Sequence, residues 1–313
     1  MATIIVSAII ELIDTTIVNV SINTMSGNLG ASLEDTAWVI TSYAIANVIV
    51  IPMTSFLAEK IGRKQYYIGS ILLFTLTSLF CGLSANLWTL VFFRFLQGVG
   101  GGALLSTSQA ILFDTFPPNQ RALVSGIFSL GIIIGPSIGP VMGGYIVDNL
   151  SWQDIFYVNI PIGLTAAFLS YAYLRPSAPS RDGRRIDWLG IGLLTAGVGS
   201  LQVVLERGET EDWFAAGYIV VLSIVSVLCI TLLIWWELRI TNPIINFRVL
   251  KSRTLAISAV MTFILGFGLF SNLFVFPLFS QRLIGYSAFQ TGMMLLPQTH
   301  LPMSVCRCSS ATL

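Results

Sequence analysis

The sequence predicts an all-α membrane protein. Of its 313 residues, 55% are hydrophobic and only 10% are charged, and the mean hydropathy is +0.82. A soluble domain carries about 25% charged residues, so most of this chain needs the apolar interior of a bilayer. Apolar windows of about 20 residues, the length that crosses a hydrocarbon core of about 30 Å, recur along almost the whole chain. None of them alternates like a membrane β-barrel strand.

These windows predict nine membrane helices and the start of a tenth. Clusters of Gly, Pro, Asn or charged residues separate them. The expected helices span 2–24, 36–57, 66–85, 88–112, 122–147, 155–174, 187–205, 215–236 and 254–278, and the tenth begins at about 289.

The basic residues predict the orientation of these helices. With the N-terminus in the cytoplasm, nearly all loop Lys and Arg residues fall inside, and only Arg207 and Arg282 lie in outer loops. The chain then divides into a six-helix bundle at 1–174, a linker with two further helices and a basic loop at 175–253, and the start of a second bundle at 254–297. A tail of different composition follows at 298–313. We expect a multi-pass protein of the bacterial cytoplasmic (inner) membrane.

Composition excludes several other classes of protein. The formal net charge of +1 argues against a nucleic-acid binder. Cys81, Cys229, Cys306 and Cys308 form no recognisable zinc or disulfide framework, and His300 is the single histidine, so no metal site is expected. No phosphate-binding loop motif occurs, so we expect no enzyme that hydrolyses ATP through it.

Three charged residues remain well inside the predicted spans: Glu11, Asp14 and Arg94. Each costs about 2.5–3.5 kcal/mol at a helix centre, so an intramembrane charge indicates a functional site, with a buried ion pair that serves packing as the alternative. Counting 1.5 Å per residue places Asp14 about 15 Å and Arg94 about 9 Å from the outer face. The depths are similar enough to predict one shared site.

Glu11 also begins a polar stripe on the first helix. Glu11 and Asp14 lie at neighbouring positions on one face, and residues at a spacing of four extend it along Thr15, Asn19 and Asn23. Such a stripe cannot face lipid, so we expect it to line a substrate cavity. The proton affinity of a carboxylate in this place depends on its neighbours, and a proton and a cationic substrate that compete for it would drive each other's release. The hypothesis is antiport.

The loop between the second and third windows reads SFLAEKIGRKQYY. Its residues Glu59, Gly62, Arg63 and Lys64 give it a resemblance to the cytoplasmic signature of the major facilitator superfamily. Ser55 stands where that family usually has Gly, and Glu59 where it has Asp. The resemblance implies a charge relay at the helix ends, whereas a short basic turn that only fixes topology remains the alternative.

The fourth window carries LVFFRFLQGVGGGAL. Arg94, Gln97, Gly98 and Gly100 resemble the R-x-x-q-G-x-g motif of the same family, in which the arginine is associated with proton transfer. These glycines lie inside an apolar helix, so they do not form a dinucleotide-binding loop.

The fifth window places small residues four apart on one face. The spacing favours close helix packing, and two prolines bend the helix. The run is similar to the antiporter signature that separates exporters from uptake members of the family, although Pro140 replaces one expected Gly. A generic packing face is the alternative. The residues concerned are Gly131, Gly135, Pro136, Gly139 and Gly143.

The first window, LIDTTIVNVSIN, completes the resemblance. Asp14, Thr16, Asn19 and Val20 match the motif of the fourteen-helix drug:proton antiporter branch of the EmrB/QacA type, whereas Asn23 replaces its final Pro. The resemblance covers residues 1–297 and implies an incomplete bundle of about 9–10 of 14 membrane helices. A C-terminally truncated product is the expectation for the tail.

The resemblance implies a proton-coupled exporter of drugs or other hydrophobic or cationic compounds that works by alternating access and is not an enzyme. Asp14 and Glu11 would bind protons or substrate, Arg94 would tune them, and the glycines of the fifth window would form the moving seam. The proton gradient would supply the energy without a cofactor. In Gram-negative bacteria such proteins often work with a periplasmic adaptor and an outer-membrane channel. Two alternatives stay open: a transporter of a specific metabolite, and a non-transporting remnant.

Overall fold

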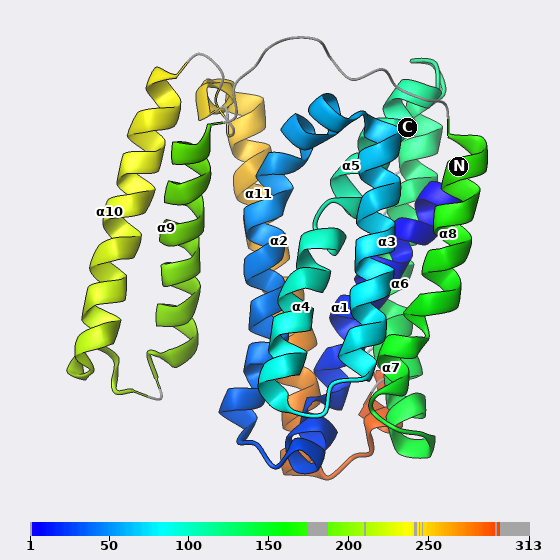
Figure 1. Ribbon diagram of the computed structural model, residues 1–313, viewed down its shortest axis with the longest axis vertical. Helices are drawn as coiled ribbons and strands as arrows, with labels where there is room; N and C mark the ends of the chain where they lie inside the picture. Colours follow the sequence, from blue (N-terminus) through cyan, green and yellow to red (C-terminus); the bar gives the residue numbers. More distant parts are fainter. Residues whose placement is uncertain are drawn as a thin grey trace, which may run out of the picture.

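The computed structural model describes residues 2–174, 187–209, 211–240, 243, 245, 247–291 and 293–294. All regular elements in these ranges are helical (Figure 1). The first six predicted membrane helices are α1 (Ala2–Leu29), α2 (Leu33–Ile61), α3 (Arg63–Gly82), α4 (Leu87–Gly101) with α5 (Leu104–Thr115), α6 (Arg121–Asn149), and α7 (Asp154–Tyr157) with α8 (Asn159–Tyr173). They are followed by α9 (Trp188–Arg207), η1 (Trp213–Ala215), α10 (Gly217–Arg239), η2 (Phe247–Lys251), α11 (Arg253–Phe279) and the π-helical turn η3 (Ser280–Ile284).

The windows predict these helices closely, with two corrections. The window 88–112 is interrupted after Gly101, so α4 and α5 are separate helices within one span, Leu87–Thr115. The window 155–174 likewise contains α7 and α8, which meet at Val158. Local signals set several starts: the Ser32 hydroxyl accepts from the N–H of Asp35 at the beginning of α2, and the Asn86 side chain caps α4 in the same way.

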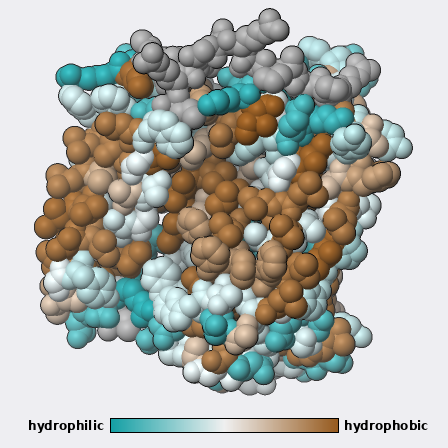
Figure 2. All heavy atoms as spheres, viewed as in Figure 1, coloured by the Kyte–Doolittle hydropathy of each residue, from teal (hydrophilic) through white to brown (hydrophobic). Residues whose placement is uncertain are grey.

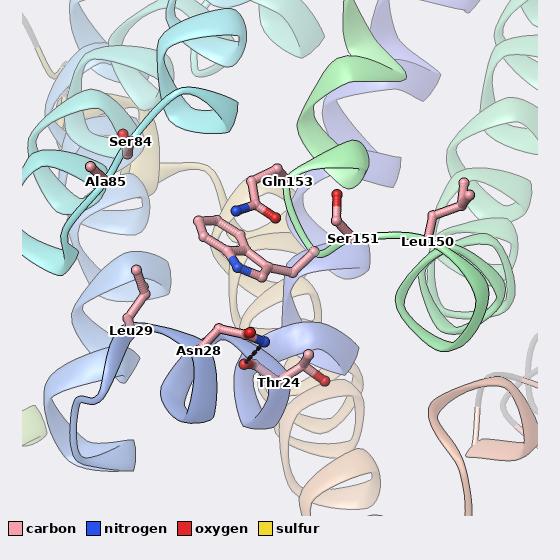
Figure 3. Close-up of a pocket in the computed structure, with 9 residues that line it drawn as sticks. Thr24, Asn28, Leu29, Ser84, Ala85, Leu150, Ser151 and Gln153 are labelled. Carbon is pink, nitrogen blue, oxygen red and sulfur yellow. Dashed lines mark hydrogen bonds between the residues drawn. The ribbon is translucent and has the colours of Figure 1, made fainter.

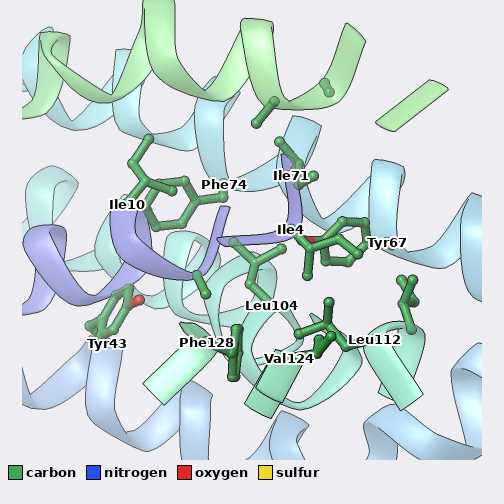
Figure 4. Close-up of a cluster of buried hydrophobic side chains, with 14 residues drawn as sticks. Ile4, Ile10, Tyr43, Tyr67, Ile71, Phe74, Leu104, Leu112, Val124 and Phe128 are labelled. Carbon is green, nitrogen blue, oxygen red and sulfur yellow. The ribbon is translucent and has the colours of Figure 1, made fainter. Parts of the chain in front are cut away.

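Helices α1–α8 form one bundle. Within it α1 packs on α6, α2 and α3 pack on α4, and α3 packs on α8. Its apolar interior divides into two clusters, one of which is shown in Figure 4, with Tyr67, Phe74 and Leu104 fully buried between the helices. Burial of these large side chains supplies the packing that fixes the bundle.

Close backbone approach in this bundle depends on α4 glycines. A Cβ placed on Gly98 would lie 2.5 Å from the carbonyl oxygen of Tyr43, and one on Gly100 would lie 2.7 Å from the backbone nitrogen of Phe74. Only a residue without a Cβ allows α4 to lie this near to α2 and α3.

Helices α9 and α10 form a hairpin beside the bundle, with α9 next to α2 (Figure 1). The hairpin is much less enclosed than the bundle, since 17% of the most apolar window of α10 is buried, against 67% for α1. Figure 2 shows apolar residues along the sides of the molecule and hydrophilic ones toward its two ends. Seven spans in the described residues are long and apolar enough to cross a membrane, two of which are the pairs α4 with α5 and α7 with α8. Helices α6 and α11, at 29 and 27 residues, also have sufficient length.

Two sequence predictions fall partly outside the described residues. The beginning of the predicted linker (175–253) and the whole predicted tail (298–313) lie there, so the domain boundaries remain predictions. The tenth helix is described only at its first residues, which begin at Ala288.

Candidate functional site

Asp14 and Arg94 form an ion pair in the interior of the bundle. One Arg94 guanidinium nitrogen lies 2.6 Å from Asp14 Oδ2, and the two side chains are 1% and 0% exposed. The structure therefore brings together the two charges that the sequence placed at similar depth. Charges removed from water in this way require nearly complete pairing.

Two amides complete the surroundings of the Asp14 carboxylate. The side chain of Asn159, the first residue of α8, donates to Oδ1 at 2.6 Å, and that of Gln97 donates to the same oxygen at 3.1 Å. Asn159 also donates to Ser78 Oγ, whose hydroxyl donates to the Phe156 carbonyl. Donors from α4 and α8 thus hold a carboxylate from α1, so the charge on Asp14 affects the contacts among three helices.

The Arg94 side chain is anchored on all sides. Its Nε donates to the carbonyl of Val39 in α2, and its terminal nitrogen donates to Gln97 Oε1 at 2.9 Å. The guanidinium carbon lies 4.2 Å from the centroid of the Tyr43 ring, within cation–π range. A proton added to Asp14 would remove the counter-charge of a guanidinium that cannot itself lose its proton, so these contacts would have to rearrange.

Glu11 lies one turn before Asp14 and is 4% exposed. Its carboxylate contacts the backbone of Leu105, just after the break between α4 and α5. Its Oε2 has no hydrogen-bond partner among the described residues. Glu11 is therefore a second buried carboxylate beside Asp14, with one oxygen able to accept a proton or a cation.

The predicted polar stripe has three different environments. The Thr15 hydroxyl donates to the Leu12 carbonyl of its own helix. The Asn19 Oδ1 is buried without a partner among the described residues. Asn23, the last member, donates to Gln281 at 2.9 Å and accepts from Arg282 at 3.3 Å, both in η3. The stripe thus runs from the buried carboxylates to a contact between α1 and the end of α11.

The signature loop lies at the opposite end of the bundle. Gly62 has φ +99°, which favours glycine, and it separates α2 from α3. Arg63 forms an ion pair with Asp114, and Lys64 donates to the Tyr171 carbonyl at 2.7 Å. The loop therefore connects to the ends of α5 and α8. Glu59 lies in the last turn of α2.

The glycine face of α6 is turned toward α1. A Cβ on Gly131 would meet Ile5, one on Gly135 would meet Leu12, and one on Gly143 would meet Ile17. Gly139 lies against Thr16 in the same contact, and Pro136 and Pro140 lie within this stretch of α6. These glycines join two helices of one bundle, and their role as a moving seam remains a prediction.

A second contact across the chain involves the end of α6. The N–H of Phe289 donates to Asp148 Oδ2 at 3.0 Å, and the rings of Tyr145 and Phe289 meet edge to face. Gly144 faces the Ala288 backbone. The region after α11 therefore contacts both α1 and α6 at the end of the bundle where the loop from α1 to α2 lies.

That end also holds a cavity of about 340 Å³ (Figure 3). It is lined by residues of α1, the turn between α3 and α4, and the turn between α6 and α7, among them Asn28, whose amide donates to the Thr24 carbonyl. Among the described residues that line it, none is charged and none is a predicted site residue. It is therefore separate from the Asp14 centre.

Sequence reasoning missed Asn159, Ser78 and Asp114 as site residues. Asn159 and Ser78 are uncharged, so the search for intramembrane charges passed over them, although Asn159 lies in the stretch IFYVNIPIG that resembles the family. Asp114 lies at the end of its window, where an acid is not unusual. Each of these residues is identified by its contact with a residue on another helix, and a sequence alone does not show such contacts.

Comparison with known proteins matches residues 4–299 to the family model described as Major Facilitator Superfamily. The chain is 38% identical over 292 residues to "Multidrug export protein EmrB" of Escherichia coli (strain K12), covering 93% of this chain and 57% of the relative. It is 36% identical over 293 residues to "Fatty acid resistance protein FarB" of Neisseria gonorrhoeae, covering 93% and 58%. This chain thus spans little more than half the length of these relatives.

Solved structures show the same fold. An inward open structure of the xylose transporter XylE from E. coli matches with a TM-score of 0.54 at 13% identity, covering 96% of this chain and 94% of that one. The relatives support the EmrB-type branch that the motifs indicated. From the family match over nearly its whole length, the chain belongs to the Major Facilitator Superfamily.

Proposed function

We propose that this chain acts in the proton-coupled export of hydrophobic or cationic compounds across the bacterial cytoplasmic membrane, with its N-terminus in the cytoplasm. The observation that carries the proposal is the buried Asp14 carboxylate, held by Arg94, Gln97 and Asn159 from two other helices. An ionisable group at this depth is costly to bury, and such groups in membrane proteins usually mark a functional site.

The proposed cycle depends on competition at the two carboxylates. In the ionised state, Asp14 is bound by three side chains, which keeps α1, α4 and α8 together around it. A proton on Asp14 removes the negative charge that Arg94 pairs with and weakens the charge-assisted hydrogen bonds. A cationic substrate near Glu11 and Asp14 would favour proton release, and a proton would favour substrate release. Proton movement in one direction would then drive substrate movement in the other.

The substrate class follows from the relatives and from the chemistry of the site. The names of the similar proteins speak of multidrug export and of fatty acid resistance, and both kinds of compound are largely apolar. The energy source would be the proton gradient, with no cofactor. Alternating access would place the substrate near the membrane midplane between bundles. A periplasmic adaptor and an outer-membrane channel are proposed partners only for a Gram-negative host.

Substrate-induced proton release tests the proposal. Everted vesicles that contain the 313-residue chain are loaded with a pH-sensitive dye and given a panel of hydrophobic cations, fatty acids and polar metabolites. We expect proton release with the hydrophobic cations, because a cation can compete with a proton for a carboxylate. Asp14→Asn keeps the shape of the side chain but removes its titration, so release should fall at least about tenfold. The comparison is made at equal amounts of folded protein, because the variant also leaves Arg94 without its counter-charge.

Asp212→Asn is the matched control, since Asp212 is exposed and its left-handed φ of +52° suits asparagine. It should leave proton release unchanged. Full coupling in Asp14→Asn would remove Asp14 from the mechanism. A response to polar metabolites alone would favour a metabolite transporter, and no response in well-expressed vesicles would favour the non-transporting remnant.

A further inference from the structure

An aromatic groove lies between α2, α4 and the end of α9, away from the Asp14 centre. Its volume is about 420 Å³. Trp88, Phe92 and Phe95 line it from α4, and Trp38 and Ser42 from α2. Trp88 and Phe92 are 62% and 57% exposed on a membrane-spanning helix, so the groove opens toward lipid. Apolar walls of this kind accept a hydrocarbon chain.

Two residues that line this groove each carry a buried polar atom without a partner in the described part of the chain. The Ser42 side chain is only 5% exposed, yet its hydroxyl makes no hydrogen bond with any described residue, and neither does the indole N–H of Trp38. Both atoms are enclosed by protein, and a buried donor without a partner is costly. Both residues line the groove, which indicates a ligand that carries hydrogen-bond acceptors.

An exposed ion pair closes one end of the groove. Arg207, the last residue of α9, lies 2.7 Å from Asp35 in the first turn of α2 and beside the Trp38 ring. The two side chains are 20% and 40% exposed. A guanidinium next to a carboxylate matches a headgroup that carries a phosphate next to an ammonium, because each charge then finds its opposite.

The residues are also ordered by depth. Asp35, Trp38 and Ser42 follow one another along α2, so a rise of 1.5 Å per residue places Trp38 about 4.5 Å and Ser42 about 10 Å below Asp35. The headgroup region of one leaflet is about 5–7 Å thick, so charges, donors and aromatic walls occur in the order of headgroup, ester groups and acyl chain. Tryptophan is typical of this boundary.

We propose that this groove is a binding site for one phosphatidylethanolamine molecule. Arg207 binds its phosphate, and Asp35 accepts from its ammonium. The indole N–H of Trp38 and the hydroxyl of Ser42 donate to its ester carbonyls, and the acyl chain lies along Trp88, Phe92 and Phe95. The lipid thereby fills the gap between the bundle and the hairpin.

Native mass spectrometry of the purified full chain tests the site. The protein is released from micelles that contain equal amounts of dioleoyl phosphatidylethanolamine, phosphatidylglycerol and phosphatidylcholine. We expect one retained phosphatidylethanolamine. Phosphatidylglycerol lacks the ammonium and phosphatidylcholine lacks its N–H donors, so both should be retained about tenfold less, as for a lost charged hydrogen bond.

Variants locate the lipid. Arg207→Gln should lower phosphatidylethanolamine retention about tenfold, whereas Arg239→Gln, beside the exposed Trp235 at the other end of the hairpin, should not. Because Arg207→Gln also breaks a contact between α9 and α2, Trp38→Phe with Ser42→Ala is the second test, since it leaves the ion pair intact. That double variant should lower retention about fivefold or more.

Equal retention of the three lipids would overturn the proposal. So would retention that neither variant changes, or displacement of the lipid by tetraphenylphosphonium, which would make the groove a drug site. Since none of these readings involves proton release, failure here leaves the proposed transport function unaffected.

Discussion

Two Asp–Arg pairs in this molecule have nearly the same length and opposite surroundings. The Asp14–Arg94 pair measures 2.6 Å between side chains that are 0% and 1% exposed. The Asp35–Arg207 pair measures 2.7 Å between side chains that are 40% and 20% exposed. The buried carboxylate has two further amide donors, Gln97 and Asn159, whereas Asp35 has the hydroxyl of Ser32.

The difference shows that distance alone does not measure the importance of an ion pair. A pair removed from water cannot lose one partner without leaving an uncompensated charge, whereas an exposed pair is screened and each partner can be solvated. The buried Asp14 accordingly has two further amide donors, whereas the exposed Asp35 has one hydroxyl donor. We therefore expect substitutions at the two pairs to differ severalfold in their effect on stability.

The largest effect should come from Arg94→Leu. The change leaves Asp14 buried without its counter-charge, which should lower the free energy of unfolding by about 3–5 kcal/mol. Unfolding of the purified protein by sodium dodecyl sulfate in mixed micelles measures it. Arg207→Leu is the matched control and should cost about 1 kcal/mol or less. Equal losses for the two arginines would contradict the comparison.

A smaller effect is expected from Asn159→Leu. Leucine has a similar volume but cannot donate, so Asp14 Oδ1 keeps only Gln97 and Ser78 loses a partner. The loss should be about 1–3 kcal/mol in the same unfolding experiment. Asn149→Leu, at an exposed residue near the end of α6, should change stability by about 0.5 kcal/mol or less. A neutral Asn159→Leu would show that the carboxylate does not need its second amide.

The smallest effect should come from Asp35→Asn. An exposed pair contributes about 0–1 kcal/mol, and salt screens it. Unfolding at about 0.05 M and at about 1 M salt should therefore give a small difference between wild type and variant that shrinks as salt rises. Asp14→Asn under the same conditions should show no such salt dependence. A cost for Asp35→Asn that persists at high salt would place this pair with the buried one.

Much of the fold could be predicted from the sequence, because hydropathy records the membrane directly. The nine windows correspond to helices or helix pairs, because a segment in lipid must satisfy its backbone hydrogen bonds internally. The breaks after Gly101 and at Val158 could not be predicted in the same way. Each stretch is hydrophobic enough to form one window despite Arg94, Gln97 and Asn159, so hydropathy carries no signal at the breaks.

The candidate site could be predicted only through its charges. Asp14, Glu11 and Arg94 stand out because charge is rare inside a span. Uncharged partners such as Asn159 and Ser78 depend on how α1, α3 and α8 pack, which no single helix specifies. The glycine face of α6 shows the same limit: the spacing of four predicts close packing, but the helix that covers it had to come from the structure.

The α6 glycines also have a mechanical consequence for the whole chain. Gly135, Gly139 and Gly143 have no side chains of their own, so α6 lies directly on the side chains and backbone of α1. Such close packing leaves the two helices little freedom to move relative to each other. They would then act as one stiff lever with Asp14 near its middle. A displacement that begins at that carboxylate would be carried to the far end of α6, where Gly144 touches the backbone of Ala288.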